Sequence, residues 1–228
     1  MPIDRPATHP GHAPPVDDAP VRGAPGRPKD LAKGAAILEA ARQMFIAHGF
    51  DGASMDQIAG QAGVSKLTVY SHFGDKDSLF AAAVRAHCEQ KLPDALFAAS
   101  PETLLRERLL EIAGAFFAMV TAPESVAGHR MLCTPKAADS SLPEVFWEAG
   151  PGRVQAAFAD LLVRRRDAGE LDVPDPVRAA SQFFVLVKGD LHARMVFGCT
   201  SAQCRAAIQA HLEASVDLFL RGYATRRG

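Results

Sequence analysis

Polar side chains gather between residues 54 and 76, and their types suit contact with a nucleic acid. The cluster contains hydroxyl groups, two amines, an imidazole and a phenol, which can hydrogen-bond to base edges or to phosphate oxygens. Outside a suitable scaffold, the same residues would be an ordinary solvated helix face. The candidate contact residues are Ser54, Ser65, Lys66, Leu67, Thr68, Tyr70, Ser71, His72 and Lys76.

Two short helices are expected to position this cluster. The first spans about residues 54–61, where Ser54 and Gln57 form a capping box in which each side chain satisfies a free backbone N–H. The second spans about residues 65–73, with Ser65 as its N-cap. Gly63 between them can adopt the left-handed conformation that a sharp turn demands.

Flanking helices complete a three-helix head. Apolar residues recur at helical spacing over residues 31–48, and Gly49 supplies a stop. Asp75 can cap a fourth helix that reaches about Leu92, and Lys76 at its start is positioned to meet a phosphate. The arrangement is typical of a helix-turn-helix. Its small core is expected to include Ala59, Ala62, Val64, Val69 and Phe73.

The segment ILEAARQMFIAHGFDGASMDQIAGQAGVSKLTVYSHFGDKDSLF resembles the N-terminal domain of the TetR family of transcriptional regulators. The resemblance covers about residues 31–80. Leu67 departs from the common pattern, which has a small residue such as glycine there, so the operator cannot be inferred. The matching positions are Phe45, Gly49, Ile58-Ala59, Ala62-Gly63-Val64-Ser65, Tyr70-x-His72-Phe73, Lys76 and Leu79.

This resemblance implies a homodimer whose third helices enter successive major grooves of a near-palindromic operator. It also implies that a small ligand in the C-terminal domain alters the spacing of the two heads, and that the protein represses. The segments FWEAGPGRVQAAFADLL and GELDVPDPVRAASQFFVLVKG resemble a subgroup of the family more loosely.

The chain divides into three parts. Residues 1–30 are rich in Pro, Gly and small polar residues, and are expected to be a disordered arm because they cannot bury enough surface to offset their ordering entropy. Arg27 and Lys29 at its end are possible contacts to the minor groove or to phosphate, or a plain soluble flank. Residues 31–77 are expected to form the DNA-binding domain, and residues 78–228 a helical ligand-binding and dimerisation domain.

The second half is also expected to be helical, which makes the fold class all-α, because no stretch shows sustained period-2 alternation. Its last two segments, about 176–197 and 202–223, have broad apolar stripes and are expected to form the dimer interface. Aromatic and sulfur-bearing side chains are candidates for an apolar ligand cavity, although most could be plain core. These candidates are Phe116, Phe117, Met119, Met131, Trp147, Phe183 and Phe184.

Composition and motifs argue against several other classes. A net charge of −1 and a pI of about 6.7 do not suit a wholly basic nucleic-acid coat. The sequence contains no GxSxG and no Gly-rich phosphate loop, so an enzyme is not expected. No Cys/His spacing suggests zinc, and neither a metal nor a cofactor is expected. The sequence also lacks an apolar stretch long enough for a membrane or a signal peptide, which favours a cytoplasmic location.

Three alternatives stay open at this point. The same scaffold could activate transcription. It could sense oxidants through a thiol, although reduced, quiet cysteines are the default. It could also be a helical interaction protein that uses the N-terminal motif only for packing. The cysteines are Cys88, Cys133, Cys199 and Cys204.

Overall fold

The computed structural model describes residues 27–98, 103–199 and 205–225, with the side chains described from residue 30 onward. Helices are the regular elements of these ranges, and one isolated antiparallel bridge joins Leu171 to Ala224. The all-α prediction is therefore confirmed. The helices are α1 (Arg27–Gly52), α2 (Met55–Ala62), α3 (Lys66–Phe73), α4 (Lys76–Lys91), α5 (Asp94–Phe97), α6 (Leu105–Thr121), α7 (Pro123–Leu132), α8 (Pro135–Ala138), α9 (Leu142–Ala149), α10 (Pro151–Asp167), α11 (Pro176–Val196) and α12 (Arg205–Tyr223).

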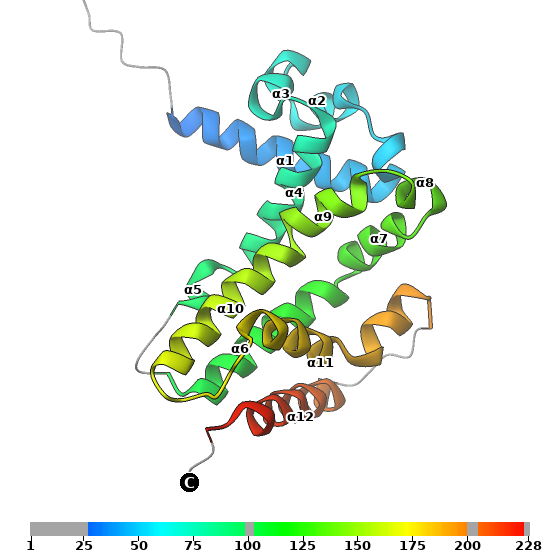
Figure 1. Ribbon diagram of the computed structural model, residues 1–228. Coiled ribbons are helices and arrows are strands. Elements are labelled where there is room, and N and C mark those ends of the chain that lie inside the picture. Colours follow the sequence, from blue (N-terminus) through cyan, green and yellow to red (C-terminus); the bar gives the residue numbers. More distant parts are fainter. Residues whose placement is uncertain (1–26, 99–102, 200–204, 226–228) are drawn as a thin grey trace, which may run out of the picture.

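Helices α1, α2 and α3 form a head at one end of the molecule, and α4 runs from this head into the body formed by α5–α12 (Figure 1). The head is closed around Ile37, Ile58 and Val69, which are fully buried. Its core continues past the predicted boundary at residue 77, because Leu79 and Phe80 of α4 pack into it. Leu142 of α9 belongs to the same core, so the head rests directly on the body.

A second core fills the body between α6, α10, α11 and α12. It is rich in aromatic rings: Phe158 stacks on Phe183 with ring centroids 4.5 Å apart, and Phe219 meets Phe183 edge-on at 5.1 Å. Burying several phenylalanines together removes a large apolar area from water. The apolar stripes of the last two predicted helices are therefore largely internal to one chain.

Helix α11 is bent at Gly189, whose backbone has φ 52° and ψ −154°. Only glycine adopts this conformation without strain. Two side chains of α12 hydrogen-bond to carbonyls just before the bend: the His211 Nε2–H donates to the Val187 carbonyl at 3.0 Å, and the Ser215 hydroxyl donates to the Leu186 carbonyl at 3.2 Å. Helix α12 thus supports the bend.

Several element boundaries differ from the prediction. Helix α1 begins at Arg27, four residues before the predicted start, because a proline such as Pro28 is tolerated in the first helical turn. It also continues to Gly52 across a non-helical residue, Gly49. Helix α6 begins at Leu105, later than the predicted start near residue 101. The short helices α5 and α8 were not predicted. The predicted arm up to residue 26 lies outside the described residues.

Within the described ranges, no single helix is long and apolar enough to cross a membrane. Helices α6 and α7, bent by 64° against each other, pass that test as a pair by length and composition alone. The apolar residues of α6, including Leu109, Ile112 and Phe117, are buried in the core of the body.

Candidate nucleic-acid interface and adjoining cavity

Local capping fixes both helices of the predicted helix-turn-helix. At the start of α2 the Gln57 N–H donates to Ser54 Oγ at 3.2 Å, and the Ser54 N–H donates to Gln57 Oε1 at 3.0 Å, which confirms the capping box. Gly63 after α2 has φ 67°, the predicted left-handed turn. Ser65 caps α3 by accepting the Thr68 N–H at 3.1 Å. Ser54 and Ser65 therefore have a structural role besides any contact to phosphate.

Helix α3 buries Val69 and turns its opposite side to solvent. Leu67 is 78% exposed and Tyr70 is 42% exposed, both large values for apolar or aromatic side chains. Lys66 and Ser71 are also exposed, and Thr68 is half-buried. An apolar side chain presented this openly beside polar ones suits the major groove, where thymine methyl groups and base-edge acceptors alternate.

The amine of Lys66 already has a partner within the head. Its Nζ lies 2.8 Å from Asp56 Oδ2 of α2, and both side chains are more than half exposed. The neighbouring carboxylate raises the pKa of Lys66. Since exposed ion pairs contribute little to stability, this amine can exchange the carboxylate for a phosphate.

His72 lies apart from the exposed face of α3. Its side chain is only 18% exposed, and its Nε2 lies 3.0 Å from Asp30 Oδ1 at the start of α1. The ring lies beside Gly34 of the same helix. His72 therefore lies between α1 and α3 in the free protein, and its predicted contact with DNA stays a prediction.

Lys76 also has an internal role that the sequence did not predict. Its Nζ donates to the Ala53 carbonyl at 3.2 Å and lies 4.4 Å from the centre of the Phe50 ring. This contact joins the start of α4 to the turn between α1 and α2, where a free carbonyl and an aromatic face both favour a cation. The half-buried side chain of Lys76 is thus held against the head, and its contact with a phosphate stays a prediction. The side chains of Arg27 and Lys29 lie outside the described residues.

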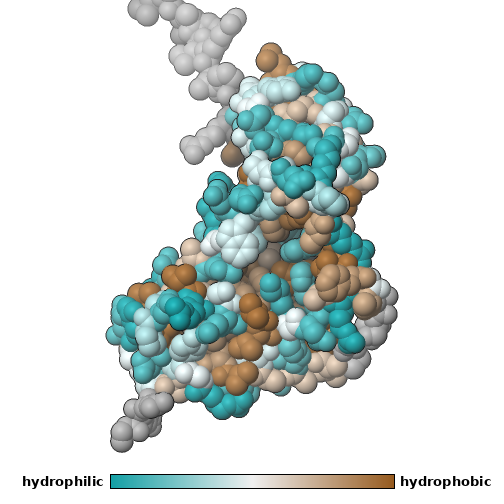
Figure 2. Space-filling model, turned by 45° about the vertical axis from the view of Figure 1, so that its right-hand side comes forward, coloured by the Kyte–Doolittle hydropathy of each residue, from teal (hydrophilic) through white to brown (hydrophobic). Residues whose placement is uncertain are grey.

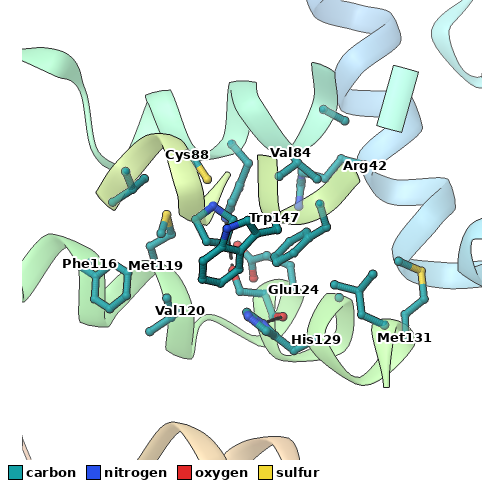
Figure 3. A pocket seen from close by; sticks show the side chains of 18 of the residues that line it. Arg42, Val84, Cys88, Phe116, Met119, Val120, Glu124, His129, Met131 and Trp147 are labelled. Carbon is teal, nitrogen blue, oxygen red and sulfur yellow. Dashed lines mark hydrogen bonds between the residues drawn. The ribbon is translucent and has the colours of Figure 1, made fainter. Parts of the chain in front are cut away.

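A cavity of about 360 Å³ lies where the head meets the body. Figure 2 shows a recess with apolar side chains in this region, and Figure 3 shows Trp147 lying across it between α4 and α7. Its walls come from α1, α4, α6, α7, α9, α10 and α11. The volume is within the usual range for a site that binds a small molecule.

Five of the seven predicted cavity residues line it, namely Phe116, Met119, Met131, Trp147 and Phe184. Phe183 does not, because it packs inside the aromatic core of the body. Phe117 does not either, and it lies near His211. The sequence did not predict that α1 and α4 contribute to the wall of the cavity. Their lining residues include Phe45, Ile46, Phe80, Ala83 and Val84.

The polar lining residues were missed as well, because single histidines on separate helices give no sequence signal. His87 of α4 lies 3.3 Å from the Ser125 hydroxyl, measured from its Nε2. His129 lies 2.7 Å from the Ser125 carbonyl, measured from its Nδ1, and its ring meets His192 of α11 edge-on at 4.7 Å. These residues bring α4, α7 and α11 together at one part of the cavity.

Burial holds all three cavity histidines in the neutral form. It is the main cause that lowers the pKa of His87 and of His129. For His192, burial together with His129 and the Lys188 ammonium lowers the pKa to about 4. At neutral pH each ring therefore offers one N–H donor and one lone-pair acceptor.

The cysteines offer little support for a thiol sensor at the cavity. Burial raises the pKa of the Cys88 thiol to about 11, so the reactive thiolate is scarce at neutral pH. Cys133 and Cys199 are exposed and free, and Cys204 lies outside the described residues. Within the described part of the chain, no group of three or more His, Cys, Asp or Glu side chains could hold a metal ion.

A capped helix-turn-helix with an exposed reading helix, set on a helical body with a cavity, defines the class of one-component DNA-binding regulators. Comparison with known proteins gives the family. Residues 37–83 match the bacterial regulatory proteins of the tetR family, and residues 107–225 match the C-terminal domain of AefR-like transcriptional repressors. The chain belongs to the TetR family of transcriptional regulators.

Individual relatives agree with this assignment. The chain is 34% identical over 105 residues to the HTH-type transcriptional activator FasR of Mycolicibacterium smegmatis, covering 46% of this chain and 47% of FasR. It thus spans about half the length of that curated relative. A TetR-family regulator from Mesorhizobium loti is 28% identical, with a TM-score of 0.73 over 86% of this chain and 99% of that one. The Flavonoid-responsive Regulator FrrA is 34% identical, with a TM-score of 0.69 over 85% of this chain and 98% of FrrA.

Proposed function

We propose that this protein is a transcriptional repressor that binds a near-palindromic operator as a homodimer and releases it when a small, largely apolar aromatic molecule enters the cavity. The observation that carries the proposal is the composition of the cavity wall. Phe45 and Ile46 of α1 and Phe80, Ala83 and Val84 of α4 share it with helices of the body. A ligand that fills the cavity therefore touches the helices that position α3.

The mechanism is a shift between two arrangements of the head. The free protein favours the arrangement that fits the operator, and the ligand binds more tightly to the other one. Helix α4 connects the two parts, since it joins the head core at Leu79 and lines the cavity at Cys88. A ligand with equal affinity for both arrangements would release nothing, however tightly it bound.

Base contacts are assigned to Leu67, Tyr70 and Ser71 on the exposed side of α3, and the amine of Lys66 on the same side is assigned to a phosphate. Thr68 stands at the edge of this side. Ser54, Ser65 and the N-terminus of α4 at Lys76 are assigned to phosphates through backbone N–H groups and hydroxyls. Action on DNA also implies that the protein works in the cytoplasm.

The dimer is proposed to form through the outer faces of α11 and α12. These faces keep Val177, Val185 and Leu218 exposed, while Val187 and Phe219 of the same helices are buried inside the chain. Exposed apolar side chains on two neighbouring helices suit a two-fold helical interface.

An aromatic effector is supported by the ring-rich lining and by the name of FrrA, which is a flavonoid-responsive protein. Activation is the second candidate, because FasR is an activator. The cavity and the reading helix suit both repression and activation. Which of the two occurs depends on where the operator lies relative to the promoter.

The test begins with a selection of genomic fragments by the purified full-length protein. The selected fragment is then labelled and titrated by fluorescence anisotropy, with and without the flavonoid naringenin. We expect nanomolar binding and its loss in naringenin, together with a change in the fluorescence of Trp147, the single tryptophan of the chain. Equal affinity for selected and random duplex at moderate salt would refute DNA regulation. Transcription in vitro from the selected promoter distinguishes repression from activation.

A further inference from the structure

One part of the cavity is polar although most of its wall is apolar. His87 from α4, Ser125 and His129 from α7, and Lys188 and His192 from α11 all line the cavity. The edge-on contact of His129 with His192 links α7 to α11 at this place. Figure 3 shows His129 and Glu124 on the α7 side of the cavity, across from Val84 and Cys88 of α4.

The position of the proton on His129 is fixed by its hydrogen bond. The Ser125 carbonyl, 2.7 Å from Nδ1, can only accept, so Nδ1 carries the hydrogen. In the neutral ring the lone pair then lies on Nε2, which makes this atom an acceptor. No described residue donates to it.

His192 adds a second unsatisfied atom. Its Nε2 is buried and has no hydrogen-bond partner among the described side chains and backbone. A buried polar atom without a partner is costly, so this atom, next to the free acceptor of His129, favours a ligand that supplies polar groups.

The charged side chains that line the cavity are Arg42, Glu124 and Lys188, and they restrict the chemistry of the ligand. Arg42 is occupied by Glu39, whose Oε1 lies 2.7 Å from its Nη2. Lys188 lines the cavity near both unsatisfied imidazoles, and its charge lowers the pKa of each. A ligand group here would therefore meet an acceptor at His129 and a donor at Lys188.

We propose that this polar end, with His129 Nε2 as acceptor and Lys188 as donor, binds a hydroxyl group, and that the effector is a hydroxylated aromatic compound, not an aromatic acid or ether. A hydroxyl gives its proton to His129 and accepts from Lys188. A carboxylate satisfies Lys188 but has no proton for His129, and an ether oxygen has none either. This inference rests on the proposed effector role of the cavity.

The experiment compares three probes that share one ring system: 2-naphthol, 2-methoxynaphthalene and 2-naphthoate. Each is titrated into the full-length protein by isothermal calorimetry at pH 7.5. We expect 2-naphthol to bind about tenfold more tightly than the ether or the acid, since an acceptor that a bound ligand shields from water and leaves unpaired costs about that factor. In His129→Phe the preference for 2-naphthol over 2-methoxynaphthalene should vanish.

His48→Phe is the control, because His48 is an exposed histidine of α1 that does not line the cavity. It should keep the preference for the hydroxyl. Equal affinities of naphthol and ether in the unaltered protein would overturn the inference, as would tighter binding of the acid. These wild-type comparisons stand even if His129→Phe does not fold. Release of the selected DNA fragment by naringenin is measured separately, so failure of the hydroxyl inference is distinguishable from failure of the proposed function.

Discussion

Lys66 shows how one residue can serve both the free and the bound protein. In the free head its amine lies against Asp56, and that carboxylate would repel a phosphate backbone. The exchange of one partner for the other costs little, because the pair is exposed on both sides. Leu67 next to it has no such partner and remains available for an apolar contact with a base.

Substitution of these two neighbours should separate phosphate contact from base contact. Lys66→Ala is expected to weaken binding to all duplexes and to reduce the slope of log K against log salt by about one. Leu67→Ala is expected to leave that slope unchanged and to cost about 1–3 kcal/mol on the selected fragment only. Anisotropy titrations at several salt concentrations measure both effects. Lys136→Ala is the control, because Lys136 of α8 in the body forms a similar exposed pair with Asp51 of α1, 3.0 Å away. An unchanged slope in Lys66→Ala would contradict the assignment.

His192 gives a prediction about pH. Its pKa is lowered to about 4 in the folded protein, from an ordinary value of 6.5. The unfolded chain therefore binds the proton first, and the stability that depends on the neutral ring is lost as the pH falls from 6.5 toward 4. We expect the urea midpoint to drop over this range, and to drop less in His192→Gln. His48→Gln, at an exposed position, should follow the wild-type curve. A wild-type midpoint that stays constant between pH 7 and pH 4.5 would argue against a buried neutral cluster.

The capping and turn residues around the reading helix could be predicted from the sequence, but the partners of His72 and Lys76 could not. Ser54, Gln57, Gly63 and Ser65 act through neighbours within four positions, so local rules were sufficient to predict their roles. Lys76 meets a carbonyl 23 positions away, a contact that depends on how α4 crosses α1. His72 likewise meets Asp30 only because α1 begins earlier than its proline and glycine content suggested.

At the scale of elements, helix α11 contains a bend that the sequence pattern did not predict. The periodicity predicted one amphipathic helix over residues 176–197, and the structure bends it at Gly189. Lys188 and His192, on either side of the bend, both line the cavity. A glycine within a helical pattern usually costs only a little helix propensity, so the pattern alone did not indicate a bend.

Gly189→Ala should therefore destabilise the protein. An added Cβ would lie 2.8 Å from Cε1 of His211. The alanine would also have to adopt the positive φ of this position, which alanine disfavours. We expect a loss of about 1–3 kcal/mol in the free energy of unfolding, measured with urea. Gly114→Ala is the control, because Gly114 lies within α6 with open space around its Cβ position, and the change should be neutral or stabilising by up to about 1 kcal/mol. Equal stability of the two variants would show that position 189 tolerates a side chain, which would contradict the requirement for glycine at the bend.

At the scale of the whole molecule, the exposed surface of α11 and α12 is the one proposed for the dimer interface. The sequence predicted these helices as the dimer interface from their apolar stripes. Four large residues of the two helices, Phe184, Val187, Leu212 and Phe219, are buried within one chain. The prediction of the interface rested on the inner faces because period and hydropathy do not distinguish burial in the monomer from burial between copies. The outer faces carry the exposed residues that such an interface needs.

Leu218→Glu is expected to break the dimer, because Leu218 is 49% exposed on α12 and a charge there would be buried between copies. Sedimentation at micromolar concentration should show a monomer, and affinity for the selected fragment should fall at least about 100-fold, since two heads no longer bind together. Leu104→Glu changes another exposed leucine at the start of α6 and should remain dimeric. A dimeric Leu218→Glu with full DNA affinity would rule out this interface.

The wall that α1 and α4 share with the body has a consequence for the cell that carries the protein. Because the effector and the operator act on the same helices, each must weaken the other by the same factor. A repressor seated on a strong operator therefore needs a higher effector concentration than one on a weak operator. A single protein controlling several promoters would then open them in order of operator strength, so that the dose of one compound sets which genes respond.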